Sequence, residues 1–359
     1  MRILIAAGGT GGHIYPGIAV AKEILRRDEK SAVRFVGTAK GLESEIVPDN
    51  GFELSLIDSA GLKNVGVAGK IKGLVILPKS FLEARKLIRD FKPDVVVGAG
   101  GYVTGAVMIT ASLMKIPTLV MDSNALPGFT NRQLARFVTK AALTFEEALP
   151  YFGKKGVVTG NPVRKEFFDI QPKLRGEKLN VLLFGGSQGA RAINFAMIDA
   201  LDHLKDFEDR LSITHQTGKF DFEKVKDGYA EKNWNSAKVS VYISDMVSEF
   251  EKTDLIISRA GATTCAEVAA AGKAAVMIPL PTAADDHQRK NAEALQGSGA
   301  VKMILQKDLS GEFLAKEIIG LINSPERVTE MEKAAKKLAR KDAAEATVDI
   351  IENLRGLRS

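Results

Sequence analysis

Cysteine and histidine are scarce in this sequence: among 359 residues there is one cysteine, Cys265, and there are four histidines. A lone cysteine excludes a disulfide within the chain and is typical of a protein kept in a reducing compartment. The two residue types nowhere cluster at the spacing of metal ligands, so we expect no structural zinc. We also expect no catalytic metal and no cofactor.

Long apolar runs are missing as well. None approaches the ~18–20 residues that a helix needs to span a bilayer. The apolar stretch at the N-terminus, from Ile3 to Ala7, leads straight into glycines, so we interpret it as a buried strand and not as a signal peptide. Hydrophobic residues make up 45% and charged residues 26% of the chain. This composition is ordinary for a folded protein, and the length favours two domains.

Acidic residues are fewer than basic residues in the first half of the chain only. Residues 1–163 carry 21 Lys and Arg against 14 Asp and Glu, whereas residues 164–359 carry 29 against 30. A basic half can serve a nucleic acid, an anionic membrane or a phosphorylated ligand. Aromatic residues are only 6%, and we find no zinc-finger spacing, RNP-like motif or interleaving of aromatic and basic residues. We therefore expect no nucleic acid among the partners.

Short apolar runs alternate with longer helical patterns throughout. Continuous apolar strands separated by helices indicate parallel sheets covered on both faces. The runs that we expect as strands are RILIAA, AVRFVG, DVVVGAG, PTLVMD and AALTF in the first half, and NVLLFGG, LSITHQ, VSVYI, DLIISR and AAVMIP in the second. From about Leu309 onward the pattern is that of amphipathic helices rich in Lys, Ala and Glu.

Each half opens with a strand, a glycine-rich turn and a helix. The first strand leads into GGTGG at residues 8–12, and the strand near residue 180 leads into GGSQGA at residues 185–190. Two such openings predict two Rossmann-like domains, joined by a proline- and charge-rich linker around residues 160–177. We expect the first domain at residues 1–163, the second at 164–340, and a C-terminal helix at 341–359 that can return to the first domain.

The glycine loops suit phosphate groups. A glycine-rich turn lets backbone approach a ligand, and the helix N-terminus behind it offers unpaired N–H groups and a partial positive charge. For any single loop, a tight turn without a ligand is the alternative. A dinucleotide site is disfavoured, because GGTGGH is not G-x-G-x-x-G and the second strand ends in no acidic residue. Two further loops, GAGGY and SRAGATTCAE, predict ligand sites on both domains and a catalytic cleft between them.

Several motifs together resemble one known family. In chain order they are GGTGGHIYPGIAVA, GGYVTG, GNPVR, GGSQGAR, SRAGATTCAEVAAAG and DHQRKNA. Over nearly the whole chain they resemble the bacterial MurG family, the undecaprenyl-diphospho-muramoylpentapeptide β-N-acetylglucosaminyltransferases of glycosyltransferase family 28. The resemblance implies an α/β protein of the GT-B fold, with two Rossmann-like domains whose parallel sheets face each other across a cleft. It also implies the lipid acceptor on the first domain and UDP-GlcNAc mainly on the second.

The donor contacts that the resemblance implies fit the chemistry of the residues. Glu267 follows Gly261 within a helix, and its carboxylate can accept two hydrogen bonds from a ribose diol. Gln288 and Asn291 share a helical face, and amides of this kind suit sugar hydroxyls. For Arg164 the alternative is a surface arginine of the linker. The implied donor set is Thr10, Gly11, Gly12, His13, Asn124, Arg164, Ser187, Gln188, Ile243 (whose backbone would pair with the uracil base), Ala262, Thr263, Glu267 and Gln288.

His13 is the candidate catalytic residue, as the general base that takes the proton from the acceptor hydroxyl, because imidazole has a suitable pKa. The alternative is a structural donor to backbone or phosphate. The implied acceptor contacts are Gly8, Gly9, Gly101, Tyr102 and Asn124.

The chain departs from the family at one acceptor motif. Where the family often has His-Glu-x-Asn, this sequence has residues 121–124 as Met-Asp-Ser-Asn. A mechanism through the usual histidine or glutamate is therefore not carried over, and Asp122 can take part of that role. Two other acids, Asp285 and Asp286, we interpret as loop carboxylates at a helix start and not as metal ligands.

A basic and apolar stretch predicts contact with a membrane. Residues 59–82 contain no acid but four lysines, including Lys70, Lys72 and Lys79, among many apolar residues. An apolar patch with a basic rim is what binding to an anionic membrane surface requires. The alternative is a core-facing helix with a solvated cationic face. The acceptor's lipid tail favours a peripheral protein on the cytoplasmic face of the cell membrane, with cell-wall synthesis proteins as candidate partners.

The predicted reaction is an inverting transfer of GlcNAc from UDP-GlcNAc to the lipid-linked muramyl-pentapeptide, which gives a β linkage in peptidoglycan synthesis. The alternatives are a diacylglycerol glycosyltransferase of the same fold, a UDP-GlcNAc epimerase on a similar scaffold, and a non-catalytic UDP-sugar-binding protein.

Overall fold

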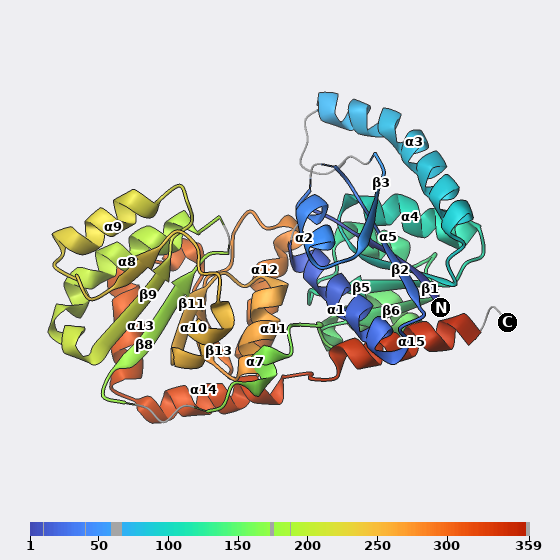
Figure 1. Cartoon of the computed structure of the whole chain (residues 1–359). Helices are drawn as coiled ribbons and strands as arrows, with labels where there is room; N and C mark the ends of the chain where they lie inside the picture. The colour runs from blue at the N-terminus through green and yellow to red at the C-terminus, as the bar shows by residue number, and fades with distance from the viewer. Residues whose placement is uncertain (10, 40, 59–66, 173–175, 187, 357–359) are drawn as a thin grey trace. The chain divides into compact units, whose positions relative to one another are not determined.

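The computed structural model of the chain describes residues 1–9, 11–39, 41–58, 67–172, 176–186 and 188–356, with the backbone alone at 67–76 and 102. The chain divides into two compact units (Figure 1). The first unit contains Met1–Val163 and Arg340–Ser359, and the second contains Arg164–Ala339. The chain thus leaves the first unit once and returns to it for its last helix.

The first unit is built on a parallel sheet with the strand order β3-β2-β1-β4-β5-β6-β7. Side chains alternate between its faces: Ile3 and Ile5 of the first strand face one apolar cluster, and Leu4 faces another. The described strands are β1 (Arg2–Ala7), β2 (Ala32–Gly37), β3 (Glu53–Leu56), β4 (Val95–Gly100), β5 (Thr118–Asp122), β6 (Lys140–Leu143) and β7 (Gly156–Val158). Its helices are α1 (Gly11–Arg27), α2 (Glu43–Asp49), α3 (Val67–Phe91), α4 (Tyr102–Leu113), α5 (Phe129–Leu134), α6 (Leu149–Phe152) and α15 (Ala343–Gly356).

Helix α15 is tied to the first unit by apolar and charged contacts. Val348 and Ile351 belong to the apolar cluster on one face of the first sheet. The Arg27 guanidinium of α1 pairs with Asp349 at 2.6 Å and with Glu352 at 2.9 Å. Figure 1 shows α15, in red, beside α1, in blue. The C-terminal helix therefore closes the first unit and is not part of the second.

The second unit repeats the architecture with the strand order β10-β9-β8-β11-β12-β13, again parallel throughout. Its described strands are β8 (Leu179–Phe184), β9 (Leu211–Gln216), β10 (Lys238–Ser240), β11 (Leu255–Ser258), β12 (Ala274–Met277) and β13 (Val301–Met303). Its helices are α7 (Glu166–Asp169), α8 (Arg191–Leu204), α9 (Phe222–Glu231), α10 (Met246–Lys252), α11 (Ala262–Ala271), α12 (His287–Gly297), α13 (Gly311–Ile322) and α14 (Pro325–Lys337).

The prediction of an α/β chain with two parallel Rossmann-like sheets is confirmed. The ten predicted runs all contain strands, and the tail after Leu309 is helical. The prediction missed β3, β7 and β13, each of which lies at the edge of its sheet.

Each sheet has a point where the chain order reverses. In the first sheet, β1 lies between β2 and β4; in the second, β8 lies between β9 and β11. Loops from the two strands that flank such a reversal diverge and leave room for a ligand at the carboxyl ends of the strands. The glycine-rich loops of this sequence follow these strands, which places them at the positions where ligands bind in such folds.

Candidate functional site

The second unit holds a pocket of about 840 Å³ at its reversal point. That volume lies in the range of small-molecule sites. Loops that follow β8, β11 and β12 form its walls, with the start of α8 and one residue of α12. The lining residues are Phe184, Gly185, Gly186, Gly189, Ala190, Arg191, Ala192, Phe195, Arg259, Gly261, Thr264, Leu280, Pro281, Thr282, Gln288 and Gln306. The structure thus brings together motifs that lie more than a hundred residues apart in sequence.

Two helix N-termini meet this pocket. Helix α11 begins at Ala262, after Gly261 with extended backbone, so the first N–H groups of the helix have no partner within it. Helix α8 begins at Arg191. Thr263 does not line the pocket, and its hydroxyl Oγ1 is buried without a hydrogen-bond partner among the described residues. Such a helix start, with its partial positive charge, suits a diphosphate.

Glu267 and Arg164 come together in the second unit. Burial raises the pKa of the partly buried Glu267 carboxyl to about 7, against the opposing influence of the Arg164 guanidinium. Arg164 is exposed and stacks over the Phe167 ring at 4.9 Å. A carboxyl group with a pKa near neutrality at a helix that opens on a pocket is typical of functional sites. The two residues remain candidates for the ribose and the nucleotide side.

Gln288 lines the pocket, whereas Asn291 does not. The Oε1 atom of Gln288 accepts the N–H of Leu280 at 3.0 Å, which fixes its amide at the wall. Asn291 is fully buried and donates to the carbonyl of Ala260 at 3.2 Å. Its amide therefore supports the loop before α11, and of the two amides only Gln288 lines the pocket. The acid Asp286 pairs with the guanidinium of Arg289 at the start of α12.

Arg259 is a pocket residue that sequence reasoning missed. Its guanidinium donates to the carbonyls of Ile278 and Pro279 and to Gln306 Oε1, at 3.1, 3.2 and 2.7 Å. Burial lowers its pKa. Its position in the sequence, directly after an apolar strand, could have identified it, because parallel sheets bind ligands at the carboxyl ends of their strands. Arg259 adds positive charge to the pocket wall.

The N–H groups of the first glycine loop are partly used within the first unit. Gly8 N–H donates to the carbonyl of Gly100 at 3.1 Å, and Gly9 N–H donates to Glu43 Oε2 at 2.9 Å. The prediction that Gly8 and Gly9 bind the acceptor therefore cannot use these two N–H groups as the structure has them. The start of α1, at Gly11 and Gly12, is the helix N-terminus that follows this loop.

His13 lies against the loop that follows β4. Its Nδ1 is 3.2 Å from the carbonyl oxygen of Gly8. A Cβ atom on Gly100 would lie 2.4 Å from His13 Cδ2, so the glycine at 100, with φ of +122°, makes room for the ring. Because a carbonyl only accepts hydrogen bonds, this contact places the proton of the neutral ring on Nδ1 and leaves Nε2 as the basic nitrogen.

Glu43 is a fully buried carboxylate beneath the first glycine loop, which follows β1. Besides Gly9, it accepts the N–H and the hydroxyl of Thr38, both at 2.8 Å. Burial by itself raises the pKa of this carboxyl, but the backbone hydrogen bonds from Thr38 and Gly9 outweigh it and lower the pKa overall. A Cβ atom on Gly37 or Gly41 would collide with the Glu43 side chain. These glycines are therefore explained by a buried carboxylate and not by a ligand.

We expect Glu43→Gln to lower the free energy of unfolding by about 1–3 kcal/mol, because the new NH₂ group cannot accept from Thr38 or Gly9. Urea unfolding at pH 7 measures the change, with Glu45→Gln, exposed on the same helix, as the control. The contribution of Glu43 is fully present above its unfolded-state pKa and disappears as the pH falls through its lower folded-state pKa. Equal unfolding of the two variants at pH 7 contradicts the prediction.

Asp122, in the motif that departs from the family, accepts several hydrogen bonds. Its oxygens accept the N–H of Asn124 at 2.9 Å, the N–H of Gly128 at 3.2 Å and the Asn131 amide at 2.8 Å. Burial raises its pKa to about 6. With both oxygens engaged and 4% of its surface exposed, Asp122 orders the loop that carries Asn124.

Some predicted site residues lie outside the described residues. These are Thr10 and Ser187, and the side chain of Tyr102. Gln188 is described and exposed, and Gly101, which caps α4, has a φ of +89°. A Cβ atom on Gly101 would lie 2.2 Å from the carbonyl oxygen of Gly8, so this glycine permits close packing of the two loops of the first unit.

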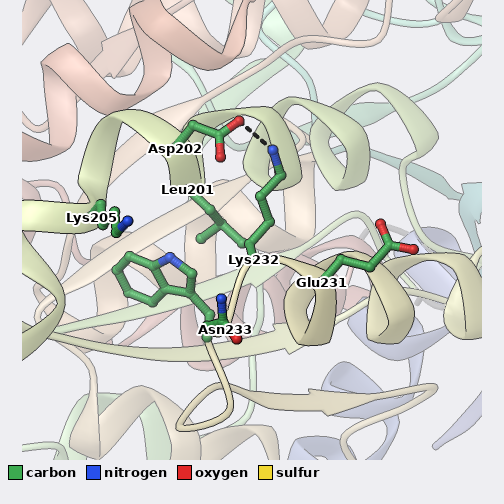
Figure 2. A pocket seen from close by; sticks show the side chains of 7 residues that line it. Leu201, Asp202, Lys205, Glu231, Lys232 and Asn233 are labelled. Atoms are coloured by element: carbon green, nitrogen blue, oxygen red, sulfur yellow. Dashed lines mark hydrogen bonds and ion pairs between the residues drawn. The ribbon is translucent and has the colours of Figure 1, made fainter.

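A second hollow of about 400 Å³ lies between α8 and α9 (Figure 2). Figure 2 shows the ion pair between Lys232 and Asp202 on its wall, with Lys205 and Glu231 nearby. It contains none of the predicted site residues. Among the described residues no group of three or more His, Cys, Asp or Glu is arranged to hold a metal ion, and no helix is long and apolar enough to cross a membrane.

The N-terminus of α11, with its partial positive charge, suits a diphosphate, and the Glu267 carboxylate on the same helix suits a ribose diol. A nucleotide sugar contains both groups, and the scaffold consists of two Rossmann-like units. This combination defines a sugar-nucleotide enzyme of the GT-B class. Residues 3–143 match the glycosyltransferase family 28 N-terminal domain, and residues 180–347 match the glycosyltransferase family 28 C-terminal domain. The chain belongs to glycosyltransferase family 28, which confirms the predicted family and fold.

Relatives that share one enzyme name match nearly the whole chain. The UDP-N-acetylglucosamine–N-acetylmuramyl-(pentapeptide) pyrophosphoryl-undecaprenol N-acetylglucosamine transferase of Myxococcus xanthus is 46% identical over 99% of this chain and 93% of its own length. The transferase of that name from Syntrophus aciditrophicus is also 46% identical, over 97% of both chains. The crystal structure of Acinetobacter baumannii MurG has a TM-score of 0.81 and 34% identity, over 98% of this chain and 99% of that one.

Proposed function

We propose that this chain transfers N-acetylglucosamine from UDP-GlcNAc to a lipid-linked muramyl-pentapeptide, in the synthesis of peptidoglycan. The near full-length identity to transferases of that name carries the proposal. The pocket of the second unit is the donor site, and the loops around His13 and Asn124 in the first unit form the acceptor site.

The chemistry assigned to the second unit is the binding of the donor and the stabilisation of its leaving group. As the glycosidic bond to UDP breaks, negative charge grows on the diphosphate. The N–H groups at the starts of α11 and α8, with Arg259 nearby, are preorganised for that charge. Glu267 accepts from the ribose diol, and Gln288 contacts the sugar. Attack by the acceptor hydroxyl on the opposite side of the anomeric carbon inverts its configuration and gives a β linkage.

Transfer of label from UDP-GlcNAc to one of two acceptors tests the proposal. The lipid-linked muramyl-pentapeptide should become labelled, and diacylglycerol should not. Labelled diacylglycerol would identify a lipid glycosyltransferase of the same fold, and conversion of UDP-GlcNAc to UDP-N-acetylmannosamine would identify an epimerase. No turnover on any acceptor would leave a UDP-sugar-binding protein. A UDP-GlcNAc 2-epimerase from Neisseria meningitidis shares the fold at a TM-score of 0.71, but its identity of 16% is evidence for the fold alone.

The membrane contact belongs to the same proposal and rests on the exposed face of α3, on the outside of the first unit (Figure 1). Leu82 is 67% exposed there, among the exposed residues Arg85, Lys86 and Arg89. A large apolar side chain with a basic rim suits an anionic membrane surface. Of the predicted lysines, Lys70 and Lys72 have no described side chains, and Lys79 pairs with the carboxylates of Asp58 and Glu83.

Because Lys79 is paired, the sharper membrane test uses Lys86 and Arg89. We expect Lys86→Glu with Arg89→Glu to weaken binding to vesicles rich in phosphatidylglycerol by about 30-fold, since each basic residue near such a surface contributes on the order of 1 kcal/mol. The loss should shrink as salt rises, and activity on a soluble, short-chain acceptor should remain. Cosedimentation measures the binding.

The matched control for the membrane variant reverses Lys224 and Lys226, which are exposed on α9 of the second unit. Equal cosedimentation of the two double variants would remove α3 from the membrane contact. Equal loss of activity on the soluble and the membrane acceptor would place Lys86 and Arg89 at the acceptor or in the fold. With the contact supported, the protein is a peripheral one on the cytoplasmic face of the membrane, where other cell-wall synthesis proteins can bind it.

A further inference from the structure

Gln216 joins two loops of the second unit through one buried amide. It is the last residue of β9, and 1% of its surface is exposed. Its Nε2 donates to the carbonyl of Gly186 at 3.0 Å, and its Oε1 accepts the N–H of Ile243 at 2.8 Å. Both ends of the side chain are therefore used, and each end contacts a different loop.

The two loops serve different parts of the proposed donor. Gly186 lies in the loop after β8, lines the pocket and belongs to the loop assigned to the diphosphate. Ile243 lies between β10 and α10, in the loop assigned to the base. The backbone just after Gln216 adds to the contact, because Thr217 N–H donates to Ser240 at 3.0 Å and Gly218 N–H to Val241 at 3.2 Å.

A primary amide fills this position with good hydrogen bonds at every pH. An amide offers one donor side and one acceptor side, an ionised carboxylate offers acceptors alone, and an aliphatic side chain offers neither. A buried carbonyl or N–H that loses its partner is destabilised. A wrong side chain at 216 therefore releases one loop or both, while the strand beneath them keeps its ladder of backbone bonds to β8 and β10.

We propose that Gln216 is a positioning residue that holds the diphosphate loop and the base loop in a fixed relation, so that both parts of UDP bind as one unit. The proposal rests on the proposed function, because it takes UDP-GlcNAc as the donor. The Ile243 N–H donates to Gln216 Oε1 at 2.8 Å. Gln216 thereby sets the place of the Ile243 backbone before the base arrives.

The test is the pH profile of UDP-GlcNAc binding by Gln216→Glu. Burial raises the pKa of the new carboxyl. Above that pKa, a carboxylate oxygen takes the place of Nε2 and faces the carbonyl oxygen of Gly186, and neither atom can donate a hydrogen bond. Binding of UDP-GlcNAc should then be at least tenfold weaker than in the unaltered protein. Below that pKa, the carboxylic acid donates to Gly186 and accepts from Ile243 as the amide does. Affinity should then return to within about threefold. Gln216→Leu should stay weak at every pH.

Dividing each dissociation constant by that of the unaltered protein at the same pH removes the titration of Glu267. The other titratable groups near Gln216 do not change the ratio of the dissociation constants. The pKa of buried His215 is lowered to about 3, so it stays neutral, and the Asp245 side chain is occupied as the cap of α10. Asp221, which pairs with the Arg191 side chain at 3.4 Å, is present in every variant. Calorimetry between pH 5.5 and 8.5 measures the constants.

The matched control is Gln296→Glu. Gln296 also accepts a backbone N–H at 2.8 Å, from Met303, but it lies away from the lining of the pocket. A ratio near one at pH 8 for Gln216→Glu overturns the proposal, and so does a loss that ignores pH and matches that of Gln216→Leu. Failure of the unaltered protein to bind UDP-GlcNAc would instead overturn the proposed function, and this inference with it.

Discussion

His13→Ala is expected to lower kcat by roughly 10²–10⁴-fold while the dissociation constant of UDP-GlcNAc stays within about twofold. The donor pocket and its lining residues belong to the second unit, whereas His13 belongs to the first. Loss of a general base removes the proton acceptor for the attacking hydroxyl, which affects the chemical step and not donor binding. Single-turnover rates and calorimetry separate the two.

The geometry around His13 gives a second route to the same effect. The contact from Nδ1 to the Gly8 carbonyl sets the tautomer, and Gly100 leaves the space that the ring fills. Gly100→Ala should therefore displace the ring, because its Cβ would lie 2.4 Å from the Cδ2 atom. We expect it to reproduce the loss in kcat without removing the imidazole. His203→Ala, exposed at the end of α8, is the control and should be silent.

An asparagine at position 13 separates the base from its alternative. If His13 only donates a hydrogen bond to backbone or phosphate, His13→Asn should keep most of the turnover, since an amide also donates. Near-normal turnover of His13→Ala would move the base elsewhere. Asp122 is then a poor replacement, because hydrogen bonds already hold both of its oxygens and its surface is almost covered.

The interior strands could be predicted from the sequence because they are covered on both faces. Such strands appear as unbroken apolar runs, for instance DVVVGAG for β4 and DLIISR for β11. The missed strands β3, β7 and β13 are three or four residues long and lie at sheet edges, partly exposed. An edge strand needs no continuous apolar run, so its pattern does not stand out from a loop.

Some features of the site are visible in local sequence, and others appear only in the tertiary structure. Glycine loops before helices are local, and their pocket could be predicted from sequence. Glu43 and Gln216 could not, since each acts on backbone groups from distant parts of its unit. Glu43 appears in the sequence as one acid among others in GLESE, and only its burial reveals the role. Lys79 shows the reverse case: in the sequence it lies in an acid-free stretch, whereas in the structure it pairs with Asp58 and Glu83.

Glu267→Ala is expected to weaken UDP-GlcNAc binding by about 1.5–3 kcal/mol, roughly 10- to 150-fold, through loss of two hydrogen bonds from the ribose diol to a carboxylate. Thermal unfolding should change little, because Glu267 is only partly buried and accepts no hydrogen bond from the other described residues. Glu223→Ala, exposed on α9, is the control. An unchanged dissociation constant for UDP-GlcNAc would remove Glu267 from the ribose.

The pH dependence of the unaltered protein tests the same residue without a mutation in the pocket. Burial raises the pKa of Glu267 to about 7, so the ionised form that accepts both diol hydroxyls is a minority at pH 6 and the majority at pH 8. Affinity for UDP-GlcNAc should therefore rise by up to about tenfold between these values. Its diphosphate carries no group that titrates in this range, and His215, with a pKa lowered to about 3, is neutral throughout. In Glu267→Gln the affinity should be lower and flat with pH, and a profile in this variant as steep as in the unaltered protein would assign the titration to another group.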